Sequence, residues 1–111
     1  MKRLLLASFF TIAALVFPGA ASAADADYKL VIENHKFQPN EITIPAGKKI
    51  RLLIENRDDT PEEFDSHDLN REKVFTGKGT ATVFIGPLTP GRYTFQGEFH
   101  PDTAQGVVIA K

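Results

Sequence analysis

The stretch Tyr93-Thr94-Phe95-Gln96-Gly97-Glu98-Phe99-His100-Pro101-Asp102 is typical of a β-strand that runs into a polar loop. Tyr93 and Phe95 supply the apolar side of the strand. Glu98 and His100 lie two residues apart, so their side chains project to the same face if the backbone stays extended. A carboxylate beside an imidazole provides two common metal ligands. This stretch therefore predicts a β-strand that presents half of a metal site.

A second stretch, residues 62–68, again places acidic groups and a histidine around a phenylalanine. Glu63, Asp65 and His67 alternate with Phe64 and Ser66, so one face of an extended segment would carry three ligands. We expect the two stretches to form two walls of one metal site. The candidate ligands are Glu63, Asp65, His67, Glu98 and His100.

Ordinary alternatives stay open at these positions. A histidine in a loop and glutamates at a strand edge are often solvated surface residues without a ligand role. Glu62 ranks below the five candidates, and Asp102 could instead cap the turn after Pro101. His35 stands apart from both walls and is interpreted as a surface residue.

The N-terminus has the pattern of a secretory signal. Met1-Lys2-Arg3 precedes an apolar run over residues 4–17, and small residues follow up to Ala23. The apolar run is shorter than the about 20 residues of a membrane-spanning helix. We therefore predict a signal peptide over residues 1–23, a single domain over 24–111, and a periplasmic location, with an uncleaved N-terminal anchor as the alternative.

The predicted mature domain has 88 residues and a formal charge of −3, from 11 basic and 14 acidic residues. This balance argues against a nucleic-acid partner. It has no segment that would insert into a membrane once the signal is removed. The chain contains no cysteine, which excludes disulfides, thiolate nucleophiles and cysteine-ligated metal centres.

Short runs rich in β-branched and aromatic residues recur between turn signals, and no window keeps a helical period. The face formed by Ile50, Leu52 and Ile54 should point into the core. Residues 69–74 have no clear period. This pattern predicts an all-β fold, an antiparallel Greek-key sandwich or barrel of six or seven strands. The clearest expected strands are 28–33, 41–44, 50–56, 80–85, 92–95 and 106–110.

The order of these parts resembles the cupredoxins. The resemblance covers the mature chain and rests on Phe37-x-Pro39-x-x-Ile42-x-Ile44-x-x-Gly47, Asn56-x-Asp58, Pro61 with Phe64, and Gly91-x-Tyr93-x-Phe95-x-x-x-x-His100-Pro101. It implies a cupredoxin-like fold.

Carried over by position, the two copper histidines of the blue-copper members fall at or beside Glu62 and at His100. The copper cysteine falls at Gly97, and the methionine falls near Thr103 or Ala104. Three of the four ligands are therefore absent, which rules out a type 1 blue-copper electron carrier.

A closer likeness is to cysteine-less cupredoxin-like domains of bacterial iron uptake, the EfeO-type N-terminal domains and the Ftr-type periplasmic proteins. The most specific residues that carry it are Gly97-Glu98-Phe99-His100-Pro101-Asp102-Thr103-Ala104. The resemblance implies a domain that binds copper or iron and assists iron import together with other periplasmic or membrane components.

Oxygen and imidazole ligands suit both copper and iron, so the identity of the metal stays open. An accessory role in Fe(II) oxidation is the one enzymatic option. The alternative function is a non-metal interaction domain that has lost the copper site and uses its carboxylates to recognise a protein partner.

Overall fold

The computed structural model describes residues 24–111, so the predicted signal peptide lies outside the described residues. These residues form nine β-strands and no helix. Within this range no helix is long and apolar enough to cross a membrane. The strands are β1 (Ala26–Glu33), β2 (Lys36–Gln38), β3 (Glu41–Ile44), β4 (Ile50–Asn56), β5 (Glu62–Ser66), β6 (Arg71–Phe75), β7 (Thr80–Ile85), β8 (Gly91–Gly97) and β9 (Gln105–Ala110).

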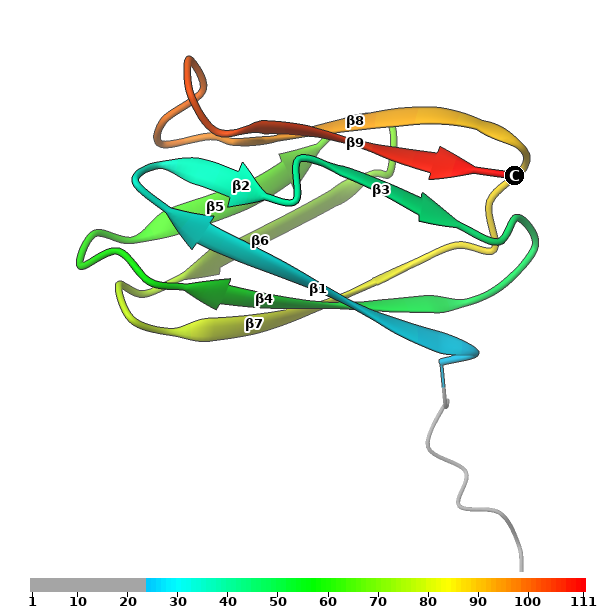
Figure 1. The fold of residues 1–111 in the computed structure, drawn as a ribbon, viewed down its shortest axis with the longest axis horizontal. Coiled ribbons are helices and arrows are strands. Elements are labelled where there is room, and N and C mark those ends of the chain that lie inside the picture. The colour runs from blue at the N-terminus through cyan, green and yellow to red at the C-terminus, as the bar shows by residue number, and fades with distance from the viewer. Residues whose placement is uncertain (1–23) are drawn as a thin grey trace, which may run out of the picture.

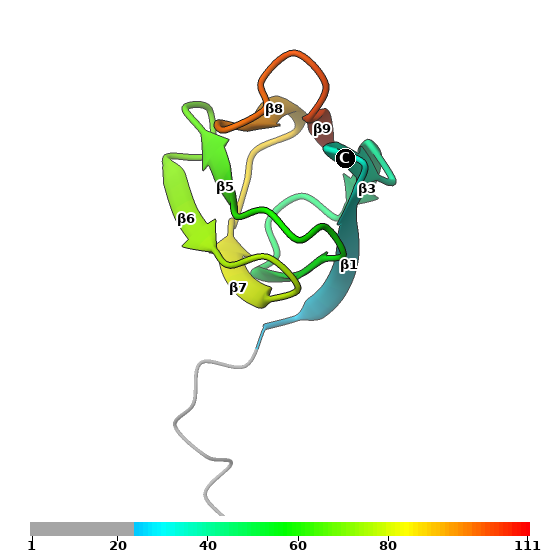
Figure 2. The ribbon, with the colours of Figure 1, turned by 90° about the vertical axis from the view of Figure 1, so that its left-hand side faces the viewer.

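Two sheets pack face to face to form a barrel-like sandwich (Figures 1 and 2). One has the strand order β2-β1-β4-β7 and the other β3-β9-β8-β5-β6. The all-β prediction is confirmed. The expectation of purely antiparallel sheets is wrong, because β1 pairs with β4, and β3 with β9, in parallel. Local alternation of side chains is the same in both kinds of pairing, so the sequence pattern did not reveal the direction of the partner strand.

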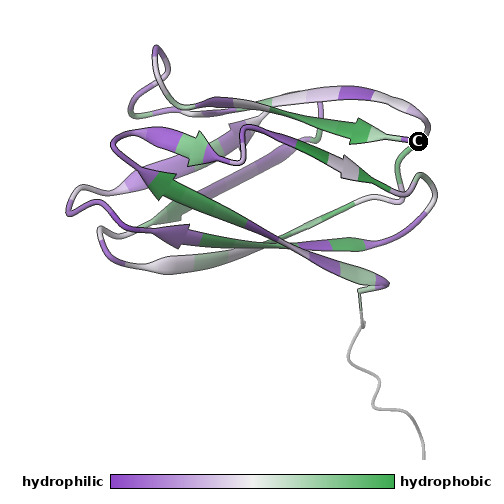
Figure 3. Ribbon diagram, viewed as in Figure 1, coloured by the Kyte–Doolittle hydropathy of each residue, from purple (hydrophilic) through white to green (hydrophobic). Residues whose placement is uncertain are grey.

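The core lies between the two sheets and follows the alternation of apolar residues along the strands. Ile50, Leu52 and Ile54 are all buried, as the sequence predicts. In Figure 3 hydrophobic and hydrophilic positions are interspersed along the strands. Near one end, the rings of Phe64 and Phe95 stack with centroids 5.0 Å apart. These aromatic rings lie in the core near the end of the barrel where β5 begins and β8 ends.

Four connections gather at that end of the barrel: the β1–β2 turn, the β4–β5 loop, the β6–β7 turn and the β8–β9 loop (Figure 1). Asn56 is buried at the end of β4 and fixes the β4–β5 loop. Its side-chain amide donates to the carbonyl oxygens of Thr60 and Thr76 at 2.8 and 3.1 Å. Its side-chain oxygen accepts the N–H of Asp58 at 3.0 Å. The Asn-x-Asp motif therefore fixes the path of the chain into β5.

Candidate metal centre

Glu62 is a buried carboxylate at the start of β5, with 1% of its surface exposed. Phe64 faces the core, and the period of two along a strand turns Glu62 to the same inner side. Its Oε1 accepts the backbone N–H groups of Glu63 and Phe99 at 3.0 and 2.9 Å. Its Oε2 lies 2.5 Å from Nδ1 of His100. Each oxygen of this buried carboxylate therefore has a hydrogen-bond partner.

His100 is held between Glu62 and a second histidine. Its ring stacks on that of His35 with the centroids 3.6 Å apart and the planes 11° from parallel. The interpretation of His35 as a residue apart from the site is therefore wrong. A carboxylate can only accept, so Nδ1 of His100 carries the hydrogen of this bond, and the form of the ring that binds a metal ion would do so through Nε2.

Asp58 positions His35. Its Oδ1 and Oδ2 accept the backbone N–H groups of Asn34 and His35 at 2.8 and 2.9 Å. Both turn residues have positive φ, 54° and 57°, as in the two-residue turns that join antiparallel strands. Burial alone would raise the pKa of Asp58, but these two N–H groups outweigh it and hold the pKa below the usual value. An ionised Asp58 thus pins the β1–β2 turn against the loop that leads to Glu62.

Gly97 lies where the resemblance places the copper cysteine, and the surrounding atoms leave no room for a side chain. A Cβ at this position would lie 2.6 Å from Cβ of Ala104 and 2.7 Å from Cδ of Glu62. The carboxylate of Glu62 and the methyl group of Ala104 therefore fill the space of a cysteine side chain. These residues do not fit a type 1 copper centre, because the chain has no cysteine and the space for its sulfur is taken.

The remaining predicted ligands lie on the outer side of the five-stranded sheet. Glu63 and Asp65 alternate with the buried residues of β5 and face outward. Glu98 follows β8, and its backbone N–H donates to the carbonyl of Glu63 at 3.0 Å. Desolvation, followed by hydrogen bonding and repulsion from the Glu98 carboxylate, raises the pKa of Glu63. This side of the sheet therefore carries close carboxylates, while the inner side carries the Glu62–His100 pair.

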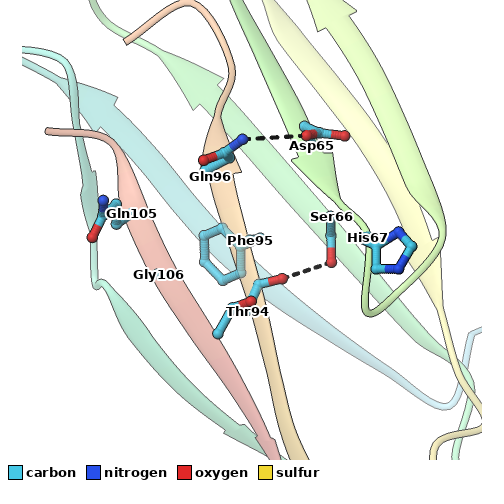
Figure 4. A pocket seen from close by; sticks show the side chains of 8 residues that line it. All are labelled: Asp65, Ser66, His67, Thr94, Phe95, Gln96, Gln105 and Gly106. Carbon is cyan, nitrogen blue, oxygen red and sulfur yellow. Dashed lines mark hydrogen bonds between the residues drawn. The ribbon is translucent and has the colours of Figure 1, made fainter. Parts of the chain in front are cut away.

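Asp65 and His67 line a surface hollow of about 390 Å³ over β5, β8 and β9 (Figure 4). The side-chain amide of Gln96 donates to Asp65 across this hollow at 3.4 Å. His67 is exposed in the turn after β5. It lies five residues beyond Glu62, which at the rise of an extended strand is roughly 16 Å from the end where His100 lies.

The residues of the two predicted walls thus lie on two sides of the sheet. The Glu62–His100 pair lies on the inner side and the other carboxylates lie on the outer side. Glu63 and Asp65 point away from the face of β5 on which Glu62 meets His100. Among residues 24–111, no group of three or more histidine, cysteine, aspartate or glutamate side chains is arranged to hold a metal ion. The assignment of Glu63, Asp65, His67, Glu98 and His100 as ligands stays a prediction.

Sequence reasoning ranked two residues of this site too low, Glu62 and His35. The signal for Glu62 was the alternation around Phe64: a strand that buries Phe64 also buries the residues two positions away. The signal for His35 was weaker. Asn34-His35 follows a clear strand, and asparagine and histidine are enriched at positive φ, which is compatible with a tight turn. Only the folded chain shows that this turn reaches His100.

Comparison with known proteins gives one family for nearly the whole chain. The model of the cupredoxin-like domain family matches residues 4–110. An uncharacterised protein of Rickettsia prowazekii (strain Madrid E) is 49% identical over 83 residues, which cover 75% of this chain and 66% of that protein. The chain thus matches just under two thirds of the length of that relative.

Solved structures match the fold at low identity. Auracyanin A, a "blue" copper protein of Chloroflexus aurantiacus, superposes with a TM-score of 0.66 at 13% identity, covering 77% of this chain and 98% of that one. Amicyanin of Paracoccus versutus gives 0.60 at 23% identity, with 83% and 87% covered. A purple cupredoxin of Nitrosopumilus maritimus gives 0.60 at 20% identity, with 77% and 100% covered.

Proposed function

Since the chain belongs to the cupredoxin-like domain family, we propose that it is a periplasmic protein that binds copper or iron and assists bacterial iron uptake. The observation that carries the metal-binding part is the hydrogen bond of 2.5 Å between buried Glu62 and Nδ1 of His100. The resemblance places one copper histidine at His100 and the other at or beside Glu62. The role in iron uptake rests on the likeness of the loop around His100 to the cysteine-less iron-uptake domains.

A carboxylate behind a histidine is the usual support of a metal-binding imidazole. The carboxylate accepts from one ring nitrogen, fixes the ring, and increases the basicity of the other nitrogen. In this protein Glu62 takes that supporting role and leaves Nε2 of His100 for the ion. The predicted ligands Glu63, Asp65, Glu98 and His67 lie on the outer side of the sheet, away from the face of β5 on which Glu62 meets His100.

A bound copper or iron ion would supply one-electron redox chemistry. The chain's own contribution is to hold the His100 ring by Glu62 and to place the apolar rings of Phe64 and Phe95 beneath the site. Phe99, with 47% of its surface exposed, stands beside the site on the β8–β9 loop. An accessory part in Fe(II) oxidation would require an electron acceptor, so we propose binding and delivery as the primary activity.

The second candidate function is a protein-interaction domain without a metal. The observation that favours it is the absence, within residues 24–111, of a preformed group of three metal-ligating side chains. In that case exposed Phe99 and the outer carboxylates would contact a partner protein through apolar burial and charge complementarity.

The test is titration of the metal-free protein with Cu(II), Fe(II) under anaerobic conditions, and Fe(III), followed by calorimetry and, for Cu(II), electron paramagnetic resonance. We expect one saturable site with nitrogen and oxygen ligands and without an intense blue band. His100→Asn should abolish it and leave the circular dichroism spectrum unchanged. No saturable binding of any of the three ions would refute metal binding and favour the interaction domain.

The role in iron uptake has a separate test in the host cell. Cell fractionation should place the protein in the periplasm, and a strain lacking it should import less radiolabelled iron when iron is scarce. Unchanged iron import in that strain would refute the transport role while leaving the titration result intact.

A further inference from the structure

The second nitrogen ligand is a histidine that lies outside the ligand positions carried over from the blue-copper proteins. We propose that His35 and His100 together form an imidazole pair that takes one divalent transition-metal ion, and that Glu62 is a positioning residue for the pair. This inference rests on the proposed metal binding and specifies which residues provide it.

The first argument is the convergence of three separate connections on one point. His35 comes from the β1–β2 turn, Glu62 follows the β4–β5 loop, and His100 comes from the β8–β9 loop. The two rings lie 3.6 Å apart and nearly parallel. Asp58 binds the backbone of the turn through both of its oxygens, so this placement of His35 is built into the fold.

The second argument concerns the free nitrogens of the pair. A neutral imidazole is the form that binds metal ions. Within residues 24–111 the His35 ring makes one side-chain hydrogen bond, a weak one of 3.3 Å between its Nε2 and the Thr60 hydroxyl. An ion can displace that contact at little cost.

The third argument concerns distance. Two imidazole nitrogens on one ion, each at about 2.0–2.1 Å, lie roughly 3 Å from each other. The ring centroids lie 3.6 Å apart, so the two rings are close enough to reach one ion. The in-plane lone pairs of parallel rings do not point at a common atom, however, and on one ion they must converge at about 90°. Because Glu62 holds the His100 ring, the half-buried His35 ring must turn out of the stack to bind the same ion.

Glu62 cannot easily serve as a third ligand. Its Oε1 accepts two backbone N–H groups and its Oε2 faces His100, so direct coordination would break these bonds in a buried place. Glu62 would influence metal binding by fixing the orientation and the tautomer of the His100 ring. Two imidazoles without a cysteine favour Cu(II), Ni(II) or Zn(II), and Cu(II) is a suitable probe.

The decisive experiment compares the two histidines that could supply a second nitrogen, His35 and His67. Asparagine tolerates the positive φ of position 35, so His35→Asn keeps the turn. With Cu(II) bound to the whole protein, pulsed electron paramagnetic resonance counts the coordinated imidazoles. We expect two in the wild type, one in His35→Asn, and two in His67→Asn.

The affinity should follow the same order. His35→Asn should weaken Cu(II) binding at least about tenfold, since even a lost hydrogen-bond partner of a ligand costs about 10–100-fold. Two imidazoles in His35→Asn, or a loss of one in His67→Asn, would overturn the proposed pair while leaving metal binding itself established. No Cu(II) binding to the wild type would overturn both.

The positioning role of Glu62 has its own readout. In Glu62→Gln the side-chain oxygen should stay on the two backbone N–H groups, so that the amide NH₂ faces Nδ1 of His100. The neutral ring must then accept at Nδ1 and carry its hydrogen on Nε2, where the ion would bind. We expect ¹⁵N NMR of the metal-free protein to report this tautomer change, with Cu(II) affinity reduced about 10–100-fold. An unchanged tautomer and affinity would overturn the positioning role.

Discussion

Replacement of Glu62 separates its hydrogen-bonding role from its charge. Glu62→Ala removes the acceptor of the backbone N–H groups of Glu63 and Phe99, and the partner of His100. Glu62→Gln keeps an oxygen for the two N–H groups, removes the charge and turns an amide NH₂ toward Nδ1 of His100. The two variants should therefore differ strongly in the free energy of unfolding, although both lose the carboxylate.

The magnitude follows from the number of groups left without a partner. Two partly buried N–H groups, each costing up to about 1–3 kcal/mol when unsatisfied, give at most roughly 2–6 kcal/mol for Glu62→Ala. The ring of His100 is 26% exposed and can turn to water, so it adds little. Glu62→Gln exchanges a charge-assisted hydrogen bond for a neutral one, at about 1–2 kcal/mol. We therefore expect Glu62→Ala to be the less stable variant by about 2 kcal/mol.

The assay is urea unfolding of the metal-free protein at pH 7, followed by circular dichroism, with the slope compared between variants to check that the unfolding transition is unchanged. Exposed Glu41 on β3 provides the matched control, and Glu41→Ala should stay within about 0.5 kcal/mol of the wild type. If Glu62→Ala fell within that same range, or if Glu62→Gln were equally destabilised, the account of Glu62 as a buried acceptor would be refuted.

Two further predictions concern packing and pH. Gly97→Ala should destabilise the fold by about 1–3 kcal/mol in thermal unfolding, because the new Cβ would overlap the Glu62 carboxylate. Gly91→Ala is the control. A Cβ at position 91 would have its nearest neighbour 3.6 Å away, so this variant should not show the overpacking cost. Glu63→Gln should raise the melting temperature at pH 7: desolvation and the nearby carboxylates raise the pKa of Glu63, so its ionisation weakens the fold as pH rises through that pKa. The gain should vanish below about pH 4, where the unfolded carboxyl is protonated too; a gain that persists there would contradict the electrostatic explanation.

Much of the strand pattern could be predicted from local sequence. The expected strands 41–44, 50–56 and 80–85 have the bounds of β3, β4 and β7. Each alternates or concentrates β-branched residues between clear turn signals, so the local signal agrees with the burial. β2 was missed because its three residues lie among the turn residues Asn34, Pro39 and Asn40, and β6 because its side chains are mostly exposed and carry little periodicity.

The candidate site was predictable only in part. The loop around His100 was identified by its carboxylate, histidine and flanking phenylalanines, and the absence of cysteine excluded a blue-copper centre. The pairing of His100 with Glu98, two residues away, was the local interpretation. In the structure the closest partners of the His100 ring are Glu62 and His35, which are 38 and 65 positions distant in the chain.

The sequence by itself determined the all-β class and the absence of any thiolate chemistry, because side-chain period and composition are local properties of the chain. The tertiary structure alone decided the direction of strand pairing and the separation of the carboxylates into an inner and an outer set. It also brought the β1–β2 turn to the β8–β9 loop. Long-range contacts of this kind depend on how the sheets close around the core, so residues such as Glu62 and His35 acquire their role only in the folded barrel.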